Sequence, residues 1–456
     1  MYTLIAITLL GICCLLLEIV NLRKIIIPFV SVGLVATLIY TLNQFGVEAS
    51  YYNNMIVTSG FTVSFSSLLI LLMLFIVLLS GDFYSKQAHK ISDYISIKLF
   101  LLVGAIAMIS FGNLAMFFLG LEVLSISLYI LAGSNPLSLN SNEAGFKYFI
   151  MGSFASGIIL FGISLIYGAV GSFDLGFIYE ASHSASTPDW FYIGVVLIAI
   201  GMLFKASVVP FHFWAPDVYE GSPTIVTLTM TTVAKIAALA TFIKLTFALT
   251  GNMNSNYNTL LIVLAVLSMC VGNIMALKQS NIKRTLAFSG ISHAGFMLVV
   301  LVNTVLDVPT LLYYAVAYTT ASIVAFSVVL VVTKDKETES LDLFKGFYKR
   351  SPLLAALFTG ALLSMAGIPI FSGFFAKLFI FNDALLAGYP VVVILGVINS
   401  IIAVFYYFRI FKVIYSTNEN ESAIITTKIP PVYYVVAIAA IVLNIAIGVY
   451  PKLIMG

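Results

Sequence analysis

Long apolar runs, separated by short polar stretches, follow one another along nearly the whole chain. The first covers residues 2–20, and runs such as 61–80, 223–249 and 309–333 have similar or greater length. A run of about 18 or more apolar residues matches a helix that crosses a lipid bilayer. Strands of a membrane barrel would instead alternate polar and apolar residues in short segments. The pattern therefore predicts an all-α polytopic membrane protein.

The runs predict about fourteen transmembrane helices. Their expected ranges are 2–20, 25–42, 61–80, 96–112, 113–133, 144–170, 190–209, 223–249, 258–277, 282–303, 309–333, 352–387, 390–412 and 431–450. Helices 7 and 12 are expected to be broken, because proline interrupts the first at Pro210 and the second within 367–373. A break at membrane depth persists only where protein or water satisfies the freed backbone groups.

The two broken helices lie five helices apart in the predicted order. A repeat with an odd number of spans inserts with opposite polarity, so two inverted five-helix repeats are expected. Inverted repeats with broken helices are typical of secondary transporters. The predicted division gives 1–95 to three N-terminal transmembrane helices, 96–250 and 251–413 to the two repeats, and 414–456 to a cytoplasmic linker and a C-terminal transmembrane helix.

Composition and charge agree with this picture and add an orientation. Hydrophobic residues make up 61% of the chain and charged residues 9%, against about 25% charged residues in soluble domains. The loops 43–60, 171–189, 250–257 and 303–308 contain no Lys or Arg, whereas the alternate loops are basic. The positive-inside rule then places the basic loops in the cytoplasm. We expect a multi-pass protein of a bacterial plasma (inner) membrane, with both termini on the outer, periplasmic side and no nucleic-acid partner.

Five titratable side chains interrupt the apolar runs near the predicted bilayer midplane. They are Glu122, Lys205, Lys235, His293 and Lys377. An ionised side chain at this depth costs roughly 3 kcal/mol on insertion scales, and such residues commonly mark ion pathways. Lys147, at the start of the sixth span, and His212, beside the first break, are further candidates.

The chemistry of these residues suits proton transfer. A carboxylate favours the charged form of a nearby lysine, so a change in the separation of Glu122 and Lys205 would switch the lysine between holding and releasing a proton. A histidine titrates near neutrality, so His293 can relay protons between the two halves. Structural interpretations stay open. Glu122 could be a charge partner only, and Lys377, beside the second break, could be structural. Lys205 and Lys235 could both reach the membrane interface, and His293 could be a hydrogen-bonded core residue.

Three segments of the chain resemble a known family. They are FKASVVPFHFWAPDVYEGSPT, MALKQSNIKRTLAFSGISHAG and FLGLEVLSISLYIL. They resemble the proton-translocating antiporter-like subunits of respiratory complex I, which are related to subunits of multisubunit Na⁺/H⁺ antiporters. The resemblance implies two inverted five-helix bundles. It also implies that Glu122 and Lys205 are the paired charges of the first half, that Lys235 connects the halves, that His293 lies on a central polar axis, and that Lys377 ends the axis.

The resemblance also implies a function and partners. The chain lacks the long lateral helix of the largest family member, subunit L, and carries Lys377 where subunit M has a glutamate. The chain is therefore expected to be the remaining antiporter-like subunit of an NADH:quinone oxidoreductase. It would be a non-redox part of a translocase that couples electron transfer to proton translocation. Its expected partners are antiporter-like and small helical membrane-arm subunits and the lipid bilayer.

Cofactors are expected in those partner subunits, which would hold flavin, iron–sulfur clusters and quinone. For this chain we expect no cofactor and no metal, because Cys13, Cys14 and Cys270 lack metal-ligand spacing. The D-type component of a multisubunit Na⁺/H⁺ antiporter stays the alternative. A stand-alone solute symporter is disfavoured, because an axis of lysines does not suit a solute-binding site.

Overall fold

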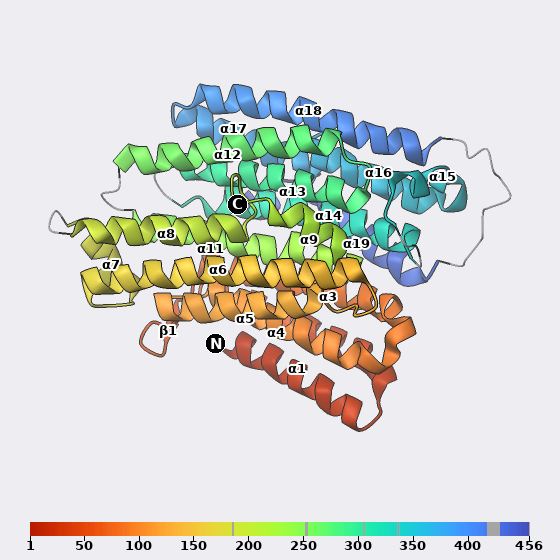
Figure 1. Ribbon diagram of the computed structural model, residues 1–456, viewed down its shortest axis with the longest axis horizontal. Helices are drawn as coiled ribbons and strands as arrows, with labels where there is room; N and C mark the ends of the chain where they lie inside the picture. The colour runs from red at the N-terminus through yellow and green to blue at the C-terminus, as the bar shows by residue number, and fades with distance from the viewer. Residues whose placement is uncertain are drawn as a thin grey trace.

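The computed structural model describes residues 1–184, 187–250, 254–303, 306–334, 336, 338–416 and 429–455. These residues form mostly helices that run along the long axis of the molecule (Figure 1). Twelve of the described helices are long and apolar enough to cross a membrane. The predicted all-α class is thus confirmed, whereas the count of about fourteen spans stays a prediction. The predicted boundary at residue 251 and the linker residues 417–428 lie outside the described residues.

Three long helices and a β-hairpin open the chain. They are α1 (Tyr2–Ile19), η1 (Arg23–Ile25), α2 (Ile26–Leu42), β1 (Ala49–Tyr51), β2 (Ile56–Thr58), α3 (Gly60–Phe83) and η2 (Ser85–Lys90). The strands β1 and β2 pair antiparallel. The hairpin contacts a second predicted loop, because Asn54 Nδ2 donates to Asp174 Oδ2 at 3.0 Å. Two loops without basic residues therefore meet at the same end of the bundle.

The first predicted repeat comprises nine elements. They are α4 (Ile91–Ile109), α5 (Leu114–Ala132), α6 (Leu139–Val170), α7 (Leu175–Ser182), α8 (Asp189–Lys205), α9 (Trp214–Gly221), α10 (Thr224–Thr229), η3 (Met230–Ala234) and α11 (Lys235–Leu249). The predicted break is confirmed, since eight residues, 206–213, separate α8 from α9 and Pro210 is one of them. Small residues bring some helices together: a Cβ atom at Gly104 of α4 would lie 2.5 Å from the Leu124 nitrogen of α5.

The second half and the C-terminal helix follow. They comprise α12 (Asn254–Leu277), α13 (Ile282–Leu298), η4 (Val299–Val302), α14 (Val308–Val332), η5 (Leu341–Phe344), α15 (Phe347–Arg350), α16 (Pro352–Ala366), α17 (Ser372–Leu386), α18 (Pro390–Ile414), α19 (Pro431–Val449) and α20 (Lys452–Met455). The second predicted break is also confirmed. Helix α16 stops at Gly367, whose left-handed φ of 88° suits glycine, and α17 begins at Ser372.

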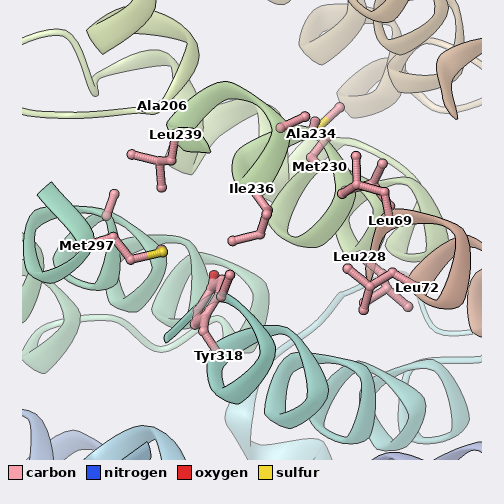
Figure 2. Close-up of a cluster of buried hydrophobic side chains, with 14 of the residues drawn as sticks. Leu69, Leu72, Ala206, Leu228, Met230, Ala234, Ile236, Leu239, Met297 and Tyr318 are labelled. Carbon is pink, nitrogen blue, oxygen red and sulfur yellow. The ribbon is translucent and has the colours of Figure 1, made fainter. Parts of the chain in front are cut away.

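The most buried helices lie in the middle of the bundle and carry two of the candidate residues, Lys235 and His293. Helices α10 and α11, together with α13, are buried throughout the apolar window, whereas only 28% of the corresponding window of α1 is buried. Figure 2 shows part of this core, where Leu69 and Leu72 of α3 lie near Leu228 of α10. Titratable groups on these central helices are therefore surrounded by protein rather than by lipid.

The two ends of the bundle differ in composition. The β1 strand and α7 lie at the left end of Figure 1, in loops without basic residues, and α15 with Lys349 and Arg350 lies at the right end. This separation agrees with the predicted alternation of basic and non-basic loops. Which end faces the cytoplasm stays a prediction, as does the inverted relation of the two repeats.

Candidate functional site

Lys205 occupies the end of the first half of the broken helix. It is the last residue of α8, because Ala206 caps the helix and Ser207 takes a left-handed φ of 60°. The buried Lys205 Nζ donates to Ser125 Oγ at 2.7 Å and to Tyr129 OH at 3.0 Å, both on α5. Ser125 Oγ donates in turn to the Leu121 carbonyl at 2.6 Å. Hydroxyl groups, rather than a carboxylate, thus hold this lysine.

Glu122 lies on the same helix as these hydroxyls, one turn before Ser125. Its side chain is half-buried, and its Oε1 atom is buried without a hydrogen bond to any described residue. Among the described residues no ion pair of 4.0 Å or less joins Glu122 to Lys205. The structure therefore places the two predicted charges on neighbouring elements without direct contact, with the Ser125 hydroxyl bonded to the lysine.

Lys235 lies where the helix geometry changes. The five residues before it form η3, a π-helical turn between α10 and α11, and such turns are frequent at functional sites. Its Nζ atom is buried, makes no hydrogen bond to a described residue and lies 5.7 Å from the Tyr219 ring centroid. A Cβ atom at Gly290 of α13 would lie 2.9 Å from this Nζ and 3.0 Å from Tyr318 OH. The missing side chain of Gly290 therefore leaves room for both polar groups.

His293 connects to a set of tyrosine hydroxyls. Its Nδ1 atom lies 2.9 Å from Tyr314 OH and its Nε2 atom 3.4 Å from Tyr407 OH. Tyr407 OH lies 2.5 Å from Ser289 Oγ, and the Tyr318 ring lies 4.8 Å from the histidine ring. Both ring nitrogens of the buried histidine thus have a hydroxyl partner that can donate or accept a proton.

Lys377 reaches back across the second break. The buried Nζ atom donates to the carbonyl oxygens of Met365 at 3.2 Å and Ala366 at 3.0 Å, at the end of α16. A positive charge there is favourable, because the last carbonyl groups of a helix lack intrahelical partners and carry partial negative charge. Lys377 Nζ also lies 5.0 Å from the Phe296 ring centroid. The lysine therefore satisfies the backbone that the break exposes.

A small cavity lies between His293 and the second break. Its volume is about 10 Å³, roughly that of one water molecule. Its lining comprises His293, Tyr314, Ala317, Tyr318, Ser364, Met365, Gly373 and Ala376. Met365 also supplies a carbonyl oxygen to Lys377. The cavity therefore joins the surroundings of the histidine to those of the terminal lysine.

The two further candidates differ in position. His212 is buried between α8 and α9, and its Nδ1 atom makes no hydrogen bond to the described residues. Lys147 has 42% of its side chain exposed and forms ion pairs with Glu143 at 2.5 Å and with Asp217 at 3.5 Å. Arg284 also binds Asp217, at 2.7 Å. Lys147 thus belongs to a surface ion network, whereas His212 lies with the buried groups.

The structure adds residues that the sequence analysis did not single out. The hydroxyl partners Ser125, Tyr129, Tyr314 and Tyr407 carry no spacing signal, because serine and tyrosine are common inside apolar helices. Lys98 is fully buried on α4. Hydropathy gives no sign of this, because the predicted span begins at residue 96, whereas α4 begins at Ile91 and places Lys98 deeper in the bundle.

Comparisons with known proteins agree with this architecture. Residues 112–403 match the family described as NADH:quinone oxidoreductase/Mrp antiporter, transmembrane region. The NADH-quinone oxidoreductase subunit N of Flavobacterium johnsoniae is 56% identical over 462 aligned residues, covering 100% of this chain and 99% of the relative.

Solved structures give the same result for the fold. A chain of respiratory complex I from Thermus thermophilus with bound aureothin has a TM-score of 0.85 and 29% identity, covering 99% of this chain and 98% of that chain. A chain of the Mrp complex from Dietzia has a TM-score of 0.84 and 20% identity, covering 99% of this chain and 95% of that chain. The latter likeness concerns the fold alone.

Proposed function

The chain belongs to the NADH:quinone oxidoreductase/Mrp antiporter family of transmembrane proteins, and we propose that it conducts protons through the buried titratable residues of its two halves. Within the family it is an antiporter-like membrane-arm subunit of an NADH:quinone oxidoreductase, of the type called subunit N. It is a multi-pass membrane protein, and its partners are the other subunits of the membrane arm.

One observation carries the proposal: buried polar groups follow one another from Lys235 to Lys377. Tyr318 OH lies within 2.7 Å of Thr231 Oγ1, one turn before Lys235, and the Tyr318 ring contacts His293. From His293 the small cavity leads to the carbonyl groups that hold Lys377. Hydroxyl and imidazole groups both donate and accept hydrogen bonds, so this series is chemically able to pass a proton in steps.

In the proposed mechanism Lys205 and Glu122 form the switch of the first half. The protonated lysine is held by two hydroxyl groups, and the carboxylate lies one helical turn along α5 from the nearer of them. Approach of the carboxylate would favour the charged lysine, and its withdrawal would favour proton release toward Lys235. A small movement beside the break at Pro210 would be sufficient, because the lysine and the carboxylate are on different elements.

The redox steps are assigned to partner subunits in this proposal. Flavin, iron–sulfur clusters and quinone would reside there, so this chain would act as a non-redox subunit driven by conformational change. We place it in a bacterial inner membrane, with the basic loops in the cytoplasm and both termini periplasmic. The divisions 1–95, 96–250, 251–413 and 414–456 would separate the N-terminal helices, two transport repeats and the C-terminal part.

The antiporter alternative shares the fold but has weaker support. The Mrp chain is 20% identical to this chain, whereas the relative from an NADH:quinone oxidoreductase is 56% identical over its whole length. Copurification of this chain with flavin- and iron–sulfur-containing subunits would support the oxidoreductase assignment. Copurification with antiporter subunits alone would overturn it.

The experiment that tests proton conduction compares two lysines of the same helix. Lys235→Met removes the buried, unbonded amine, and Lys244→Met serves as the control, because Lys244 lies toward the other end of α11 and donates to the Phe111 carbonyl at 2.7 Å. We expect Lys235→Met to lose most NADH-driven proton translocation in inverted vesicles with normal assembly, and Lys244→Met to keep it. A wild-type number of protons per NADH in Lys235→Met would overturn the proposed route.

A further inference from the structure

A further buried lysine, Lys98, lies outside the series of residues described above. Lys98 has no exposed surface, and its Nζ atom donates to Ser80 Oγ of α3 at 2.7 Å. No ion pair of 4.0 Å or less includes Lys98 among the described residues. A buried charge without a charge partner is costly, and an ionisable group inside a membrane protein is commonly functional. The burial of an ionisable group at Lys98 is therefore not explained by packing alone.

The groups around Lys98 are compatible with both the protonated and the neutral form of its amine. Ser80 Oγ gives its own hydrogen to the Ile76 carbonyl at 2.6 Å, so it is available as an acceptor for the lysine. The Tyr84 ring centroid lies 4.7 Å from Nζ, a geometry that stabilises an ammonium group. Neither partner carries a negative charge, so the neutral amine can also occupy this position without leaving an acid unpaired.

The other titratable groups near α4 do not provide a carboxylate partner. Those on α4 itself, on the elements packed against it, and at their ends include Cys14, Glu18, Asp82, Tyr84, Asp93, Tyr94, Glu122, Tyr129, Lys235 and Lys244. Of the acids, Glu18 pairs with Arg23 and Asp82 pairs with Lys334. Lys98 therefore depends on the hydroxyl and ring contacts for the stability of its charged form.

A large polar cavity lies next to Tyr84. It measures about 510 Å³, and Tyr84, Gln87 and Ser134 contribute to its lining. Its lining also includes the exposed residues Asn140 and Lys336, so it extends to the surface at the basic end of the bundle. Tyr84 is thus in contact with both this cavity and Lys98.

Tyr84 has a polar group available for water. Its hydroxyl is buried and makes no hydrogen bond to the described residues. The Tyr84 ring stacks on Tyr94 at a centroid distance of 4.3 Å, and Tyr94 OH lies 3.2 Å from Gln87 Oε1 and 3.0 Å from the Ser134 carbonyl. A stacked pair of tyrosines with polar hydroxyl groups therefore lies next to the cavity lining and, through Tyr84, next to Lys98.

We propose that Lys98 is a proton-binding site that exchanges protons with the basic-end cavity past Tyr84. In the binding step, a hydronium ion in the cavity gives its proton to the neutral amine, which leaves water and an ammonium group bonded to Ser80. Release reverses the step. The site is separate from the Lys235–Lys377 series and, as a proton-entry site at the basic end, contributes to the same NADH-driven translocation.

Thiol accessibility tests the connection to the cavity. In the assembled complex, with Cys13, Cys14 and Cys270 replaced by alanine, Lys98→Cys is compared with Leu101→Cys, a fully buried position one turn further along α4. A small cationic methanethiosulfonate is added to inverted vesicles, which expose the basic end. We expect Lys98→Cys to react at least tenfold faster, and faster still after Tyr84→Ala. Equal, slow reaction at both positions would overturn the proposal.

Charge substitution then separates a titrating lysine from a fixed structural charge. Arginine keeps a permanent charge and does not release its proton, whereas methionine is neutral. If Lys98 exchanges protons, Lys98→Arg and Lys98→Met both lower NADH-driven proton translocation severalfold in the assembled complex. If the charge is only structural, Lys98→Arg keeps normal translocation, and that result would contradict a proton-binding role.

Discussion

Lys205 donates its shortest side-chain hydrogen bond to Ser125, at 2.7 Å, and not to Glu122 one turn earlier on the same helix. The hydroxyl therefore holds the ammonium group while the carboxylate stays separate. A lysine bound by neutral acceptors loses less on giving up its proton than a lysine in a direct ion pair. The arrangement suits a lysine that must release its proton when the carboxylate moves.

The first prediction concerns this hydroxyl. Ser125→Ala removes one of two hydrogen-bond acceptors of Lys205, and a hydrogen bond to a charged group contributes about 1.5–3 kcal/mol. We expect proton translocation to fall about tenfold while the complex assembles. Ser127→Ala is the matched control, because the hydrogen bond of Ser127 to a described residue stays within its own helix, at the Val123 carbonyl. Equal translocation rates in the two variants would remove Ser125 from the mechanism.

The second prediction uses the space at Gly290. Gly290→Ala would place a methyl group 2.9 Å from Lys235 Nζ and 3.0 Å from Tyr318 OH, so at least one of these groups must move. We expect a severalfold loss of NADH-driven acidification. Gly157→Ala is the control, because nothing lies within 4 Å of a Cβ atom at that position. An unchanged rate in Gly290→Ala would show that the positions of Lys235 Nζ and Tyr318 OH beside Gly290 are dispensable for transport.

The third prediction concerns orientation. Ser50 is exposed and lies in a loop without basic residues. Thr338 is also exposed and lies in a basic loop. In a variant without native cysteines, Ser50→Cys is expected to react with an impermeant thiol reagent added to intact cells. Thr338→Cys is expected to react only in inverted vesicles. The opposite labelling pattern would place the basic loops outside and overturn the proposed orientation.

The sequence was sufficient for the class of fold and for the position of both breaks. Hydropathy locates spans, and Pro210 and Gly367 each have a direct effect on the backbone, so these features are local. The separation of Glu122 from Lys205 was not predictable, because it depends on how α5 is rotated against α8. The depth of Lys98 was missed for a related reason, since hydropathy placed the start of α4 five residues too late.

The hydroxyl partners of His293 could not be predicted from the sequence for another reason. Tyr314 and Tyr407 reach His293 from α14 and α18, so the three side chains meet only after helices distant in sequence have packed. The π-helical turn before Lys235 likewise leaves no mark in the sequence Met-Thr-Thr-Val-Ala. The backbone breaks at proline and glycine were thus accessible to sequence analysis, whereas the contacts between helices and the π-helical turn were not.

The central claim is that Lys205 must take up and release a proton for transport to occur. The most direct measurement is the number of protons translocated per NADH oxidised in vesicles that contain Lys205→Ala, with the amount of intact complex measured alongside. We expect this ratio to fall to a small fraction of the wild-type value, to fall also in Glu122→Gln, and to recover in part in Glu122→Asp. A Lys205→Ala complex that assembles normally and keeps the wild-type ratio would contradict the account.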